Sequence, residues 1–234
     1  MLLAPGCGGD DGDGAASGPL TISAAASLQT ALTECAPDAR LQFAGSDELA
    51  AQIRRDAPVD VLAAANTKIP DTLAGEGELE EPVAFVTNQL VLAVPADGDV
   101  AGLDDLRREG ARIVIGAEGV PVGDYTRSVL ANLPPGQGDA ILANVRSEEP
   151  DVKGVVGKLV QGAADAGFAY ATDVAAAGGD LRAIELPAEL EPVATYGAGV
   201  VAASERKQQA RAFVDGLTDG PCHEALLAAG FEEP

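Results

Sequence analysis

The chain has 234 residues, of which 37 are acidic and 15 are basic, and its formal net charge is −22 at pH 7. Proteins that bind nucleic acid hold the phosphates with clustered lysine and arginine, so this composition argues against that class of partner. Hydrophobic residues make up 47% of the chain, but aromatic residues make up only 3% and tryptophan is absent. The length allows either one large domain or two lobes around an aliphatic core.

The first residues, MLLAPGCGGDDGDGAASG, are a short apolar stretch, then Cys7, then a segment rich in glycine, aspartate and serine. They look like the end of a bacterial lipoprotein signal. Under this interpretation residues 1–18 are signal remnant and flexible tether, and Cys7 carries the lipid. The alternative is a disordered tail with an incidental cysteine. No other stretch reaches the roughly 18 consecutive apolar residues that a membrane-spanning helix needs.

From Leu20 onward, short β-rich runs alternate with helical patterns, which is typical of an α/β fold with a mainly parallel sheet. The pattern predicts strands at residues 20–24, 40–44 and 59–63, with a helix after each of the first two. This part of the chain therefore forms a β-α-β-α-β unit.

A second lobe is predicted between two apolar strands that cross from one lobe to the other. The outgoing strand covers residues 88–95 and the returning strand covers residues 195–202. We therefore expect lobe one at residues 19–90 and 197–234 and lobe two at residues 91–196, with the crossing strands as the hinge. The remaining predicted elements are strands at 112–116 and 166–170, and helices after Pro121, at 152–162, at 204–217 and at 221–229.

Two serines follow consecutive predicted strands, each at the start of a helix. Ser27 lies in AAASLQTAL and Ser46 lies in FAGSDEL. The simplest interpretation is that each serine is the N-cap of its helix. In open α/β sheets, however, ligands bind outside the carboxyl ends of the strands, where helix N-termini attract anions. The pair therefore also indicates an anion site.

Two further helix starts contain proline, in Val120-Pro-Val122 and in Pro150-Asp-Val152. Proline is common in the first turn of any helix, so each signal is weak alone. The unpaired N–H groups of such a turn are nevertheless suitable donors for an anion.

At these positions the chain resembles the molybdate-binding proteins of ABC importers, two-lobed receptors that are periplasmic or lipid-anchored. The resemblance covers most of the chain and rests on AAASLQTAL, FAGSDELAAQI, APVDVLAAAN, NQLVLAVP, VPVGDY and DVKGVVGKLVQGAADAGFAYATD. It implies a type II periplasmic-binding-protein fold and an oxyanion held by two serines, two backbone N–H groups and a tyrosine hydroxyl. The residues in these roles are Ser27, Ser46, Val122, Val152 and Tyr170.

The resemblance also implies the biology: a monomeric receptor of the cell envelope that binds molybdate or tungstate, has no cofactor, and delivers its ligand to an ABC permease. Two details depart from the family pattern: Val122 stands where alanine is common, and Asp47 follows Ser46 where many relatives have a small hydroxyl residue. A carboxylate there has a favourable position in the first turn of a helix, but it repels an anion unless it points outward. A different alignment places Val145 in the role of Val152, but an acidic residue, valine and a basic residue at the start of an apolar helix favour Val152.

Neutral donors and helix N-termini can bind a dianion without lysine or arginine, provided that water is excluded and each oxygen is satisfied. Discrimination then depends on cavity size, because molybdate and tungstate are larger than sulfate. Other classes stay open: a receptor for sulfate, phosphate or a chelated metal, a sensor without a transporter, or an enzyme with a serine nucleophile. The enzyme is disfavoured because the single histidine, His223, lies outside every motif and no Ser/His/Asp arrangement is evident.

Cys35 and Cys222 are both assigned to lobe one, on its first helix and near its last helix. An oxidising compartment makes a disulfide between them possible. Two unpaired buried cysteines are the alternative.

Overall fold

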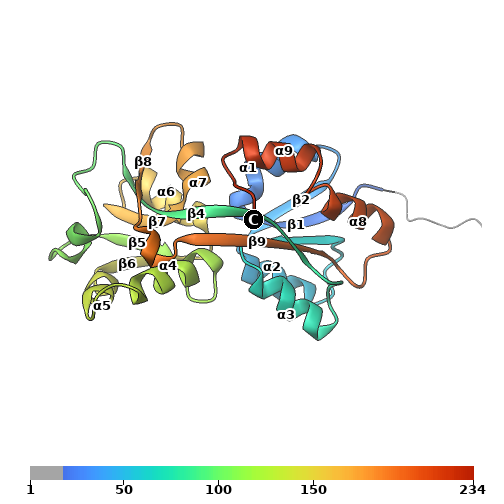
Figure 1. The fold of residues 1–234 in the computed structure, drawn as a ribbon, viewed down its shortest axis with the longest axis horizontal. Coiled ribbons are helices and arrows are strands. Elements are labelled where there is room, and N and C mark those ends of the chain that lie inside the picture. The colour runs from blue at the N-terminus through green and yellow to red at the C-terminus, as the bar shows by residue number, and fades with distance from the viewer. Residues whose placement is uncertain (1–17) are drawn as a thin grey trace, which may run out of the picture.

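The computed structural model of the protein describes residues 18–234, which form two halves lying side by side (Figure 1). Two long strands, β4 (Val83–Pro95) and β9 (Val193–Val200), run through the middle of the molecule and join the halves. Helices flank the sheet in both halves. The predicted α/β class and two-lobed architecture are therefore confirmed. The predicted lipid attachment site, Cys7, lies outside the described residues.

The first half is built on three parallel strands in the order β2-β1-β3. Strand β9 follows β3 in the sheet and runs antiparallel to it. The elements are β1 (Thr21–Ala25), the 3-10 helix η1 (Ala26–Leu28), α1 (Gln29–Cys35), β2 (Arg40–Ala44), α2 (Ser46–Ile53), β3 (Val61–Ala64), α3 (Lys68–Glu76), α8 (Lys207–Asp215) and α9 (Pro221–Ala228).

The second half repeats this arrangement with three parallel strands in the order β7-β5-β6. Strand β4 lies beside β7 and also pairs with β8. The elements are η2 (Leu103–Arg107), β5 (Ile113–Gly116), α4 (Pro121–Ala131), α5 (Gln137–Leu142), β6 (Val145–Glu149), α6 (Val152–Val160), β7 (Ala166–Tyr170), α7 (Ala171–Ala176), β8 (Leu181–Glu185) and η3 (Ala188–Leu190).

The sheet is mixed, whereas the sequence predicted a mainly parallel sheet in each lobe. Parallel pairing is confined to the three-strand core of each half, and β4 pairs antiparallel with β9, β7 and β8. The strand that leaves a half and the strand that returns to it run in opposite directions, so their pairing is antiparallel. The partners of β4 change between Gln89 and Leu90. The lobe boundaries at 90/91 and 196/197 stay predictions.

Two strands were missed by the sequence analysis. Strand β6 has the sequence VRSEE and β8 has the sequence LRAIE. Both carry charged residues and alternate between less and more exposed positions, so neither gives the continuous apolar run of a buried strand. Periodicity therefore finds the apolar strands and misses these two charged ones.

Local signals fix several helix ends. Helix α4 has Pro121 at its first position, and α3 ends at Gly77, whose φ of 83° is left-handed. At the start of α6 the carboxylate of Asp151 accepts a hydrogen bond of 2.9 Å from the N–H of Gly154. That bond makes Asp151 the N-cap, so Pro150 precedes the helix instead of beginning it.

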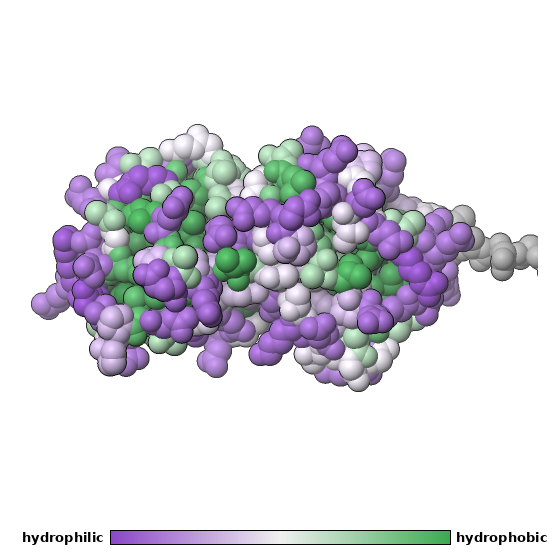
Figure 2. Space-filling view, in the orientation of Figure 1, coloured by the Kyte–Doolittle hydropathy of each residue, from purple (hydrophilic) through white to green (hydrophobic). Residues whose placement is uncertain are grey.

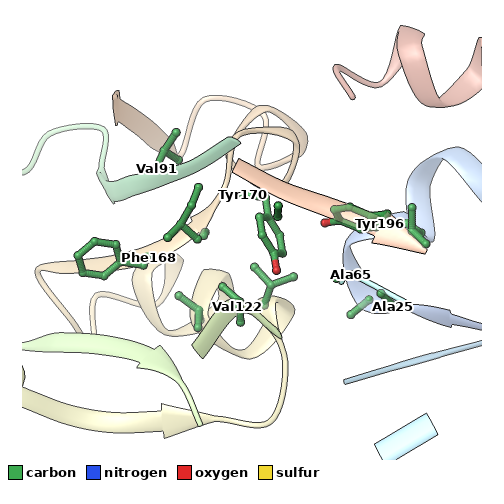
Figure 3. Packing of buried hydrophobic residues seen from close by; sticks show 14 of the residues in the cluster. Ala25, Ala65, Val91, Val122, Phe168, Tyr170 and Tyr196 are labelled. Carbon is green, nitrogen blue, oxygen red and sulfur yellow. The ribbon is translucent and has the colours of Figure 1, made fainter. Parts of the chain in front are cut away.

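The main hydrophobic core is continuous through both halves and is mostly aliphatic. Its largest fully buried members are aromatic, and two of them, Tyr170 of β7 and Tyr196 of β9, are in contact. The ring of Tyr196 makes edge-on contacts with Phe85, Tyr170 and Phe231, at centroid distances of 6.2, 5.9 and 5.3 Å. Figure 3 shows Tyr170 and Tyr196 beside each other, with Ala25, Ala65 and Val122 nearby. A smaller core under α2 and α3 belongs to the first half alone.

The surface is predominantly polar, as expected from the net charge. Polar residues cover both ends of the face in Figure 2, and hydrophobic residues show in patches among them. Within residues 18–234, no helix combines the length and the apolar character needed to cross a membrane.

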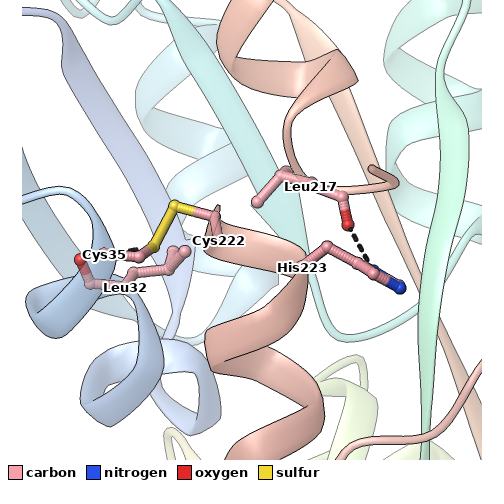
Figure 4. The surroundings of a disulfide bond; sticks show 5 residues. All are labelled: Leu32, Cys35, Leu217, Cys222 and His223. Atoms are coloured by element: carbon pink, nitrogen blue, oxygen red, sulfur yellow. Dashed lines mark hydrogen bonds between the residues drawn. A yellow bond between two sulfur atoms is a disulfide. The ribbon is translucent and has the colours of Figure 1, made fainter. Parts of the chain in front are cut away.

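A disulfide joins the beginning and the end of the first half. Cys35, the last residue of α1, is bonded to Cys222 in the first turn of α9 (Figure 4). The two cysteines are 187 residues apart, so the bond closes most of the described chain into one loop.

Replacing both cysteines by serine is expected to lower the free energy of unfolding by about 5 kcal/mol, because a loop of this length loses much entropy when it is closed in the unfolded state. Chemical denaturation of parent and variant measures the difference. A thiol count on the unreduced, denatured protein is the control. Reactive thiols at both Cys35 and Cys222 would show that the bond does not form.

Candidate ligand-binding site

A small cavity of about 20 Å³ lies between the two halves. Its lining comes from the carboxyl ends of the parallel strands of both halves and from the residues directly after them, which is where open α/β sheets bind ligands. The lining residues are Ala25, Ala26, Ser27, Ala44, Gly45, Ser46, Ala65, Val120, Pro121, Val122, Asp151, Val152 and Tyr170. All five residues that the sequence analysis assigned to the site are among them.

Ser46 contributes a hydroxyl from the first half. It is 1% exposed and is the first residue of α2, while the N-cap position belongs to Gly45. Its Oγ accepts a 3.0 Å hydrogen bond from the N–H of Ala65, just after β3. The predicted capping role is therefore wrong, because the Oγ is used by another strand end. The hydroxyl proton of Ser46 is left to donate to a ligand.

Ser27 is also not an N-cap. It lies inside η1, makes no capping bond, and is 6% exposed. Its Oγ lies 2.9 Å from the hydroxyl of Tyr196 on β9. Both serines thus have a buried partner within the fold and still border the cavity.

Val122 contributes a backbone N–H from the second half. It is the second residue of α4, so its N–H has no acceptor within the helix. The start of α4 packs directly on the residues after β5. The contact is so close that a Cβ at Gly123 would lie 2.1 Å from the carbonyl oxygen of Ala117. Glycine at this position lets the α4 N-terminus reach the cavity.

Val152 is the first residue of α6, and its N–H also lacks an intrahelical acceptor. Val145, the other candidate for this role, is the first residue of strand β6 and does not line the cavity. The geometry therefore favours Val152.

Tyr170, the last residue of β7, is 1% exposed and its hydroxyl has no hydrogen-bond partner among the described residues. In Figure 3 its side chain extends toward Val122. Burial, with Tyr196, Tyr125 and Asp173 nearby, raises the pKa of Tyr170 well above the ordinary value of 10.0. The phenol therefore stays protonated and remains a donor. A buried hydroxyl without a partner is costly, so an acceptor in the cavity would stabilise it.

Negative charges lie at the edge of the cavity. The carboxylate of Asp151 accepts the Gly154 N–H and so belongs to the helix cap. Asp47 is exposed, and its pKa is raised, mainly by partial burial and also by Glu48 and by Asp124 of the second half. Asp47 thus stands in a locally negative rim. Among the described residues that line the cavity, none is lysine or arginine.

A buried ion pair accompanies Tyr170. The carboxylate of Asp173, in the first turn of α7, has no exposed side-chain surface and lies 2.8 Å from the Nζ of Lys153. Burial raises the pKa of Asp173 and Lys153 opposes this shift. Lys153 follows Val152, so its positive charge compensates the carboxylate close to the proposed anion donors.

The described residues do not form a site for a metal ion. Within residues 18–234, no group of three or more histidine, cysteine, aspartate or glutamate side chains has the geometry to hold a metal ion. The imidazole of His223 lies 3.1 Å from the Leu217 carbonyl oxygen and 2.9 Å from a Glu233 carboxylate oxygen, and it does not line the cavity.

Comparison with known proteins identifies the family. Residues 20–232 match the family described as bacterial extracellular solute-binding proteins. The chain is 30% identical to the molybdate-binding protein ModA of Mycobacterium tuberculosis, with 97% of this chain and 92% of that protein covered. It is 27% identical to the putative ABC transporter substrate-binding lipoprotein YvgL of Bacillus subtilis, over 99% of this chain and 94% of that one.

The protein belongs to the family of bacterial extracellular solute-binding proteins. Its fold is similar to that of the periplasmic molybdate-binding protein of Azotobacter vinelandii, with a TM-score of 0.81, 19% identity, and 92% and 99% of the two chains covered.

Some contacts of this solute-binding protein were not foreseen. Ser46 is hydrogen-bonded to the N–H of Ala65, which is 19 residues away in the sequence, and Ser27 is hydrogen-bonded to Tyr196, which is 169 residues away. Local spacing cannot reveal such pairs. One signal was present for Tyr196: it is one of only three tyrosines in the chain and lies in the predicted returning strand.

The two halves of the solute-binding protein touch beside the cavity. A Cβ at Gly45 would lie 2.4 Å from the carbonyl oxygen of Pro150, which precedes α6 in the other half. No side chain fits in that space. The backbone φ of Gly45 is −61°, so an alanine there meets no backbone strain. Glycine is required at this position by the contact between the halves.

Gly45→Ala is therefore expected to hold the halves apart and to raise the radius of gyration, measured by X-ray scattering in excess molybdate. The matched control is Gly75→Ala in α3, because a Cβ there meets nothing within 4 Å. Gly45→Ala also loses a little helix capping at α2, and melting curves of the unliganded variants measure that loss of stability separately from the change in radius of gyration. A Gly45→Ala protein as compact as the control would contradict the proposed role of this contact.

Proposed function

We propose that this protein is an extracytoplasmic receptor that captures molybdate or tungstate between its two lobes and delivers it to an ABC importer. The observation that carries the proposal is the convergence of uncharged donors on one cavity, with the buried Tyr170 hydroxyl still lacking an acceptor. The names of the relatives in Mycobacterium and Bacillus support it. The proposed donors are Ser27, Ser46, Tyr170 and the N–H groups of Val122 and Val152.

The donor set favours a fully ionised oxyanion. Each proposed group is able to donate a hydrogen, and an anion without protons can accept from all of them. Hydrogen phosphate carries a proton of its own that needs an acceptor. The carboxylate of Asp151, the one acidic residue among the described residues that line the cavity, accepts the Gly154 N–H with its Oδ1 and keeps its Oδ2 as an acceptor. Phosphate must therefore turn its proton toward Asp151, a restriction that does not apply to molybdate, tungstate and sulfate, which are fully ionised near neutral pH.

Cavity size supplies the second restriction. A cavity of about 20 Å³ favours one compact group over a chelated metal or an organic solute. Among tetrahedral oxyanions, a rigid cage fitted to the longer bonds of molybdate and tungstate would hold sulfate loosely.

The site also accommodates the net charge of −22. The proposed donors from α4 and α6 lie at helix N-termini, where the backbone carries partial positive charge. Because these groups are buried with the ligand, their attraction is less screened than that of the exposed acidic side chains. The electrostatic potential inside the cavity is therefore set mainly by these nearby donors and less by the net charge of the protein.

The attachment of the receptor is also proposed. We expect Cys7 to carry a lipid that holds the protein on the outer face of the cytoplasmic membrane, as the N-terminal sequence indicates. The protein would act as a monomer that presents its two lobes to the permease. We propose no catalytic step.

A thermal-shift panel with molybdate, tungstate, sulfate and phosphate tests the ligand class. Molybdate and tungstate are each expected to raise the melting temperature, since a ligand at about 1,000 times its dissociation constant stabilises the native state by roughly 4 kcal/mol. Sulfate should give a smaller shift and phosphate the smallest. A larger shift with sulfate or phosphate would assign the receptor to that anion.

Tyr170→Phe provides the cleanest test of the site. It removes a hydroxyl that has no hydrogen-bond partner in the described part of the chain, so stability should be unchanged or slightly higher, while the lost hydrogen bond to a charged ligand should weaken binding roughly 10- to 100-fold. Isothermal titration calorimetry with molybdate measures this. The serine variants are less clean, because Ser27 and Ser46 also bond within the fold.

The matched control is Tyr125→Phe, which removes the hydroxyl of a tyrosine in the same half that does not line the cavity. Exposed Ser128→Ala is a second control. Both should bind molybdate as the parent does. Unchanged affinity in Tyr170→Phe would exclude Tyr170 from the site.

A further inference from the structure

Tyr196 lies directly behind one of the proposed donors. Its hydroxyl oxygen is 2.9 Å from the Oγ of Ser27, and the contact is buried. Tyr196 itself is 0% exposed and does not line the cavity. Its hydroxyl therefore acts on the ligand site through Ser27.

The direction of this hydrogen bond decides what Ser27 can do. A serine hydroxyl has one proton and two lone pairs. If Ser27 gave its proton to Tyr196, it would turn lone pairs toward the cavity and repel an anion. If Tyr196 gives its proton to Ser27, the proton of Ser27 is left to donate into the cavity.

We propose that Tyr196 is a positioning residue whose phenolic O–H donates to the Ser27 Oγ and thereby directs the Ser27 proton toward the bound oxyanion. This inference rests on the proposed function, because it requires Ser27 to act as an anion donor. It adds to the site a residue that does not touch the ligand.

Two features make Tyr196 suited to this role. The ring is held by edge-on contacts with Phe85, Tyr170 and Phe231, so the hydroxyl has little freedom to move. Burial, together with the nearby Asp173, raises the pKa of Tyr196 well above 10.0. The phenol therefore keeps the proton that it donates throughout the physiological pH range.

The position of Tyr196 also connects both halves to the donor. It lies on β9 opposite Val86 of β4, in the pair of strands that joins the halves. Its hydroxyl contacts Ser27 of the first half, and its ring contacts Tyr170 of the second half. One side chain thus touches proposed donors from both lobes.

A double-mutant cycle separates positioning from ordinary packing. The variants are Tyr196→Phe, Ser27→Ala and the double variant, with Tyr125→Phe as the matched control, and titration calorimetry measures the molybdate affinity of each. Tyr196→Phe keeps the ring and its aromatic contacts. The double variant removes both hydroxyls of the pair, so no buried hydroxyl is left without its partner. The double variant is therefore expected to fold.

Tyr196→Phe is expected to weaken molybdate binding about 3- to 10-fold, since a serine hydroxyl released from its partner has three staggered orientations and only one donates to the ligand. In the Ser27→Ala background the same change should have no effect on affinity. Melting temperatures of the unliganded variants verify that each protein is folded during the titration.

The outcomes distinguish this inference from the proposed function. If Ser27→Ala binds molybdate as tightly as the parent, the proposed site itself is wrong. If Ser27→Ala weakens binding but Tyr196→Phe does not, the site stands and positioning by Tyr196 is overturned. An equal loss from Tyr196→Phe in both backgrounds also overturns it, because Tyr196 would then act without Ser27.

Discussion

Buried hydrogen-bond donors that have no acceptor among residues 18–234 are the constraint around which this structure is arranged. The first N–H groups of a helix cannot bond within that helix, and α4 and α6 bring theirs to the same cavity as the unpartnered hydroxyl of Tyr170. Such groups are costly in an empty site. In the proposed complex an anion accepts from these groups of the second half and from Ser27 and Ser46 of the first half. Donors divided between the halves would therefore account for affinity and for the attraction that brings the halves together.

This arrangement makes the strongly acidic surface compatible with anion binding. Charged side chains on the surface act through water and salt, which weaken their effect over about 8–10 Å. The cavity uses fixed dipoles whose directions are set by the ends of strands and the starts of helices. The backbone dipoles at the cavity thus favour a negatively charged ligand, while the acidic side chains on the surface keep the protein soluble.

The sequence predicted the strand-to-helix junctions well, because each combines an apolar run with a helix start within a few residues. It therefore singled out Ser27 and Ser46, which both line the cavity. It misjudged their partners, since the contacts of Ser46 with Ala65 and of Ser27 with Tyr196 depend on tertiary packing. The charged edge strand β6 was missed for a different reason: its VRSEE sequence has no apolar periodicity. That strand contains Val145, so the geometry favours Val152, as the sequence pattern did.

The continuous strand β4 has a mechanical consequence. Its first part belongs to one sheet and its second part to the other, with the change between Gln89 and Leu90. At this level the returning chain passes through Pro192, whose carbonyl oxygen accepts the N–H of Leu90 at 2.7 Å and which has no N–H of its own. A bend confined to this point leaves the strand ladders on both sides intact. A flexure joint at this point, in which elastic bending of the backbone replaces the breaking of hydrogen bonds, would let the halves open and close with the strand pairing of each half undamaged.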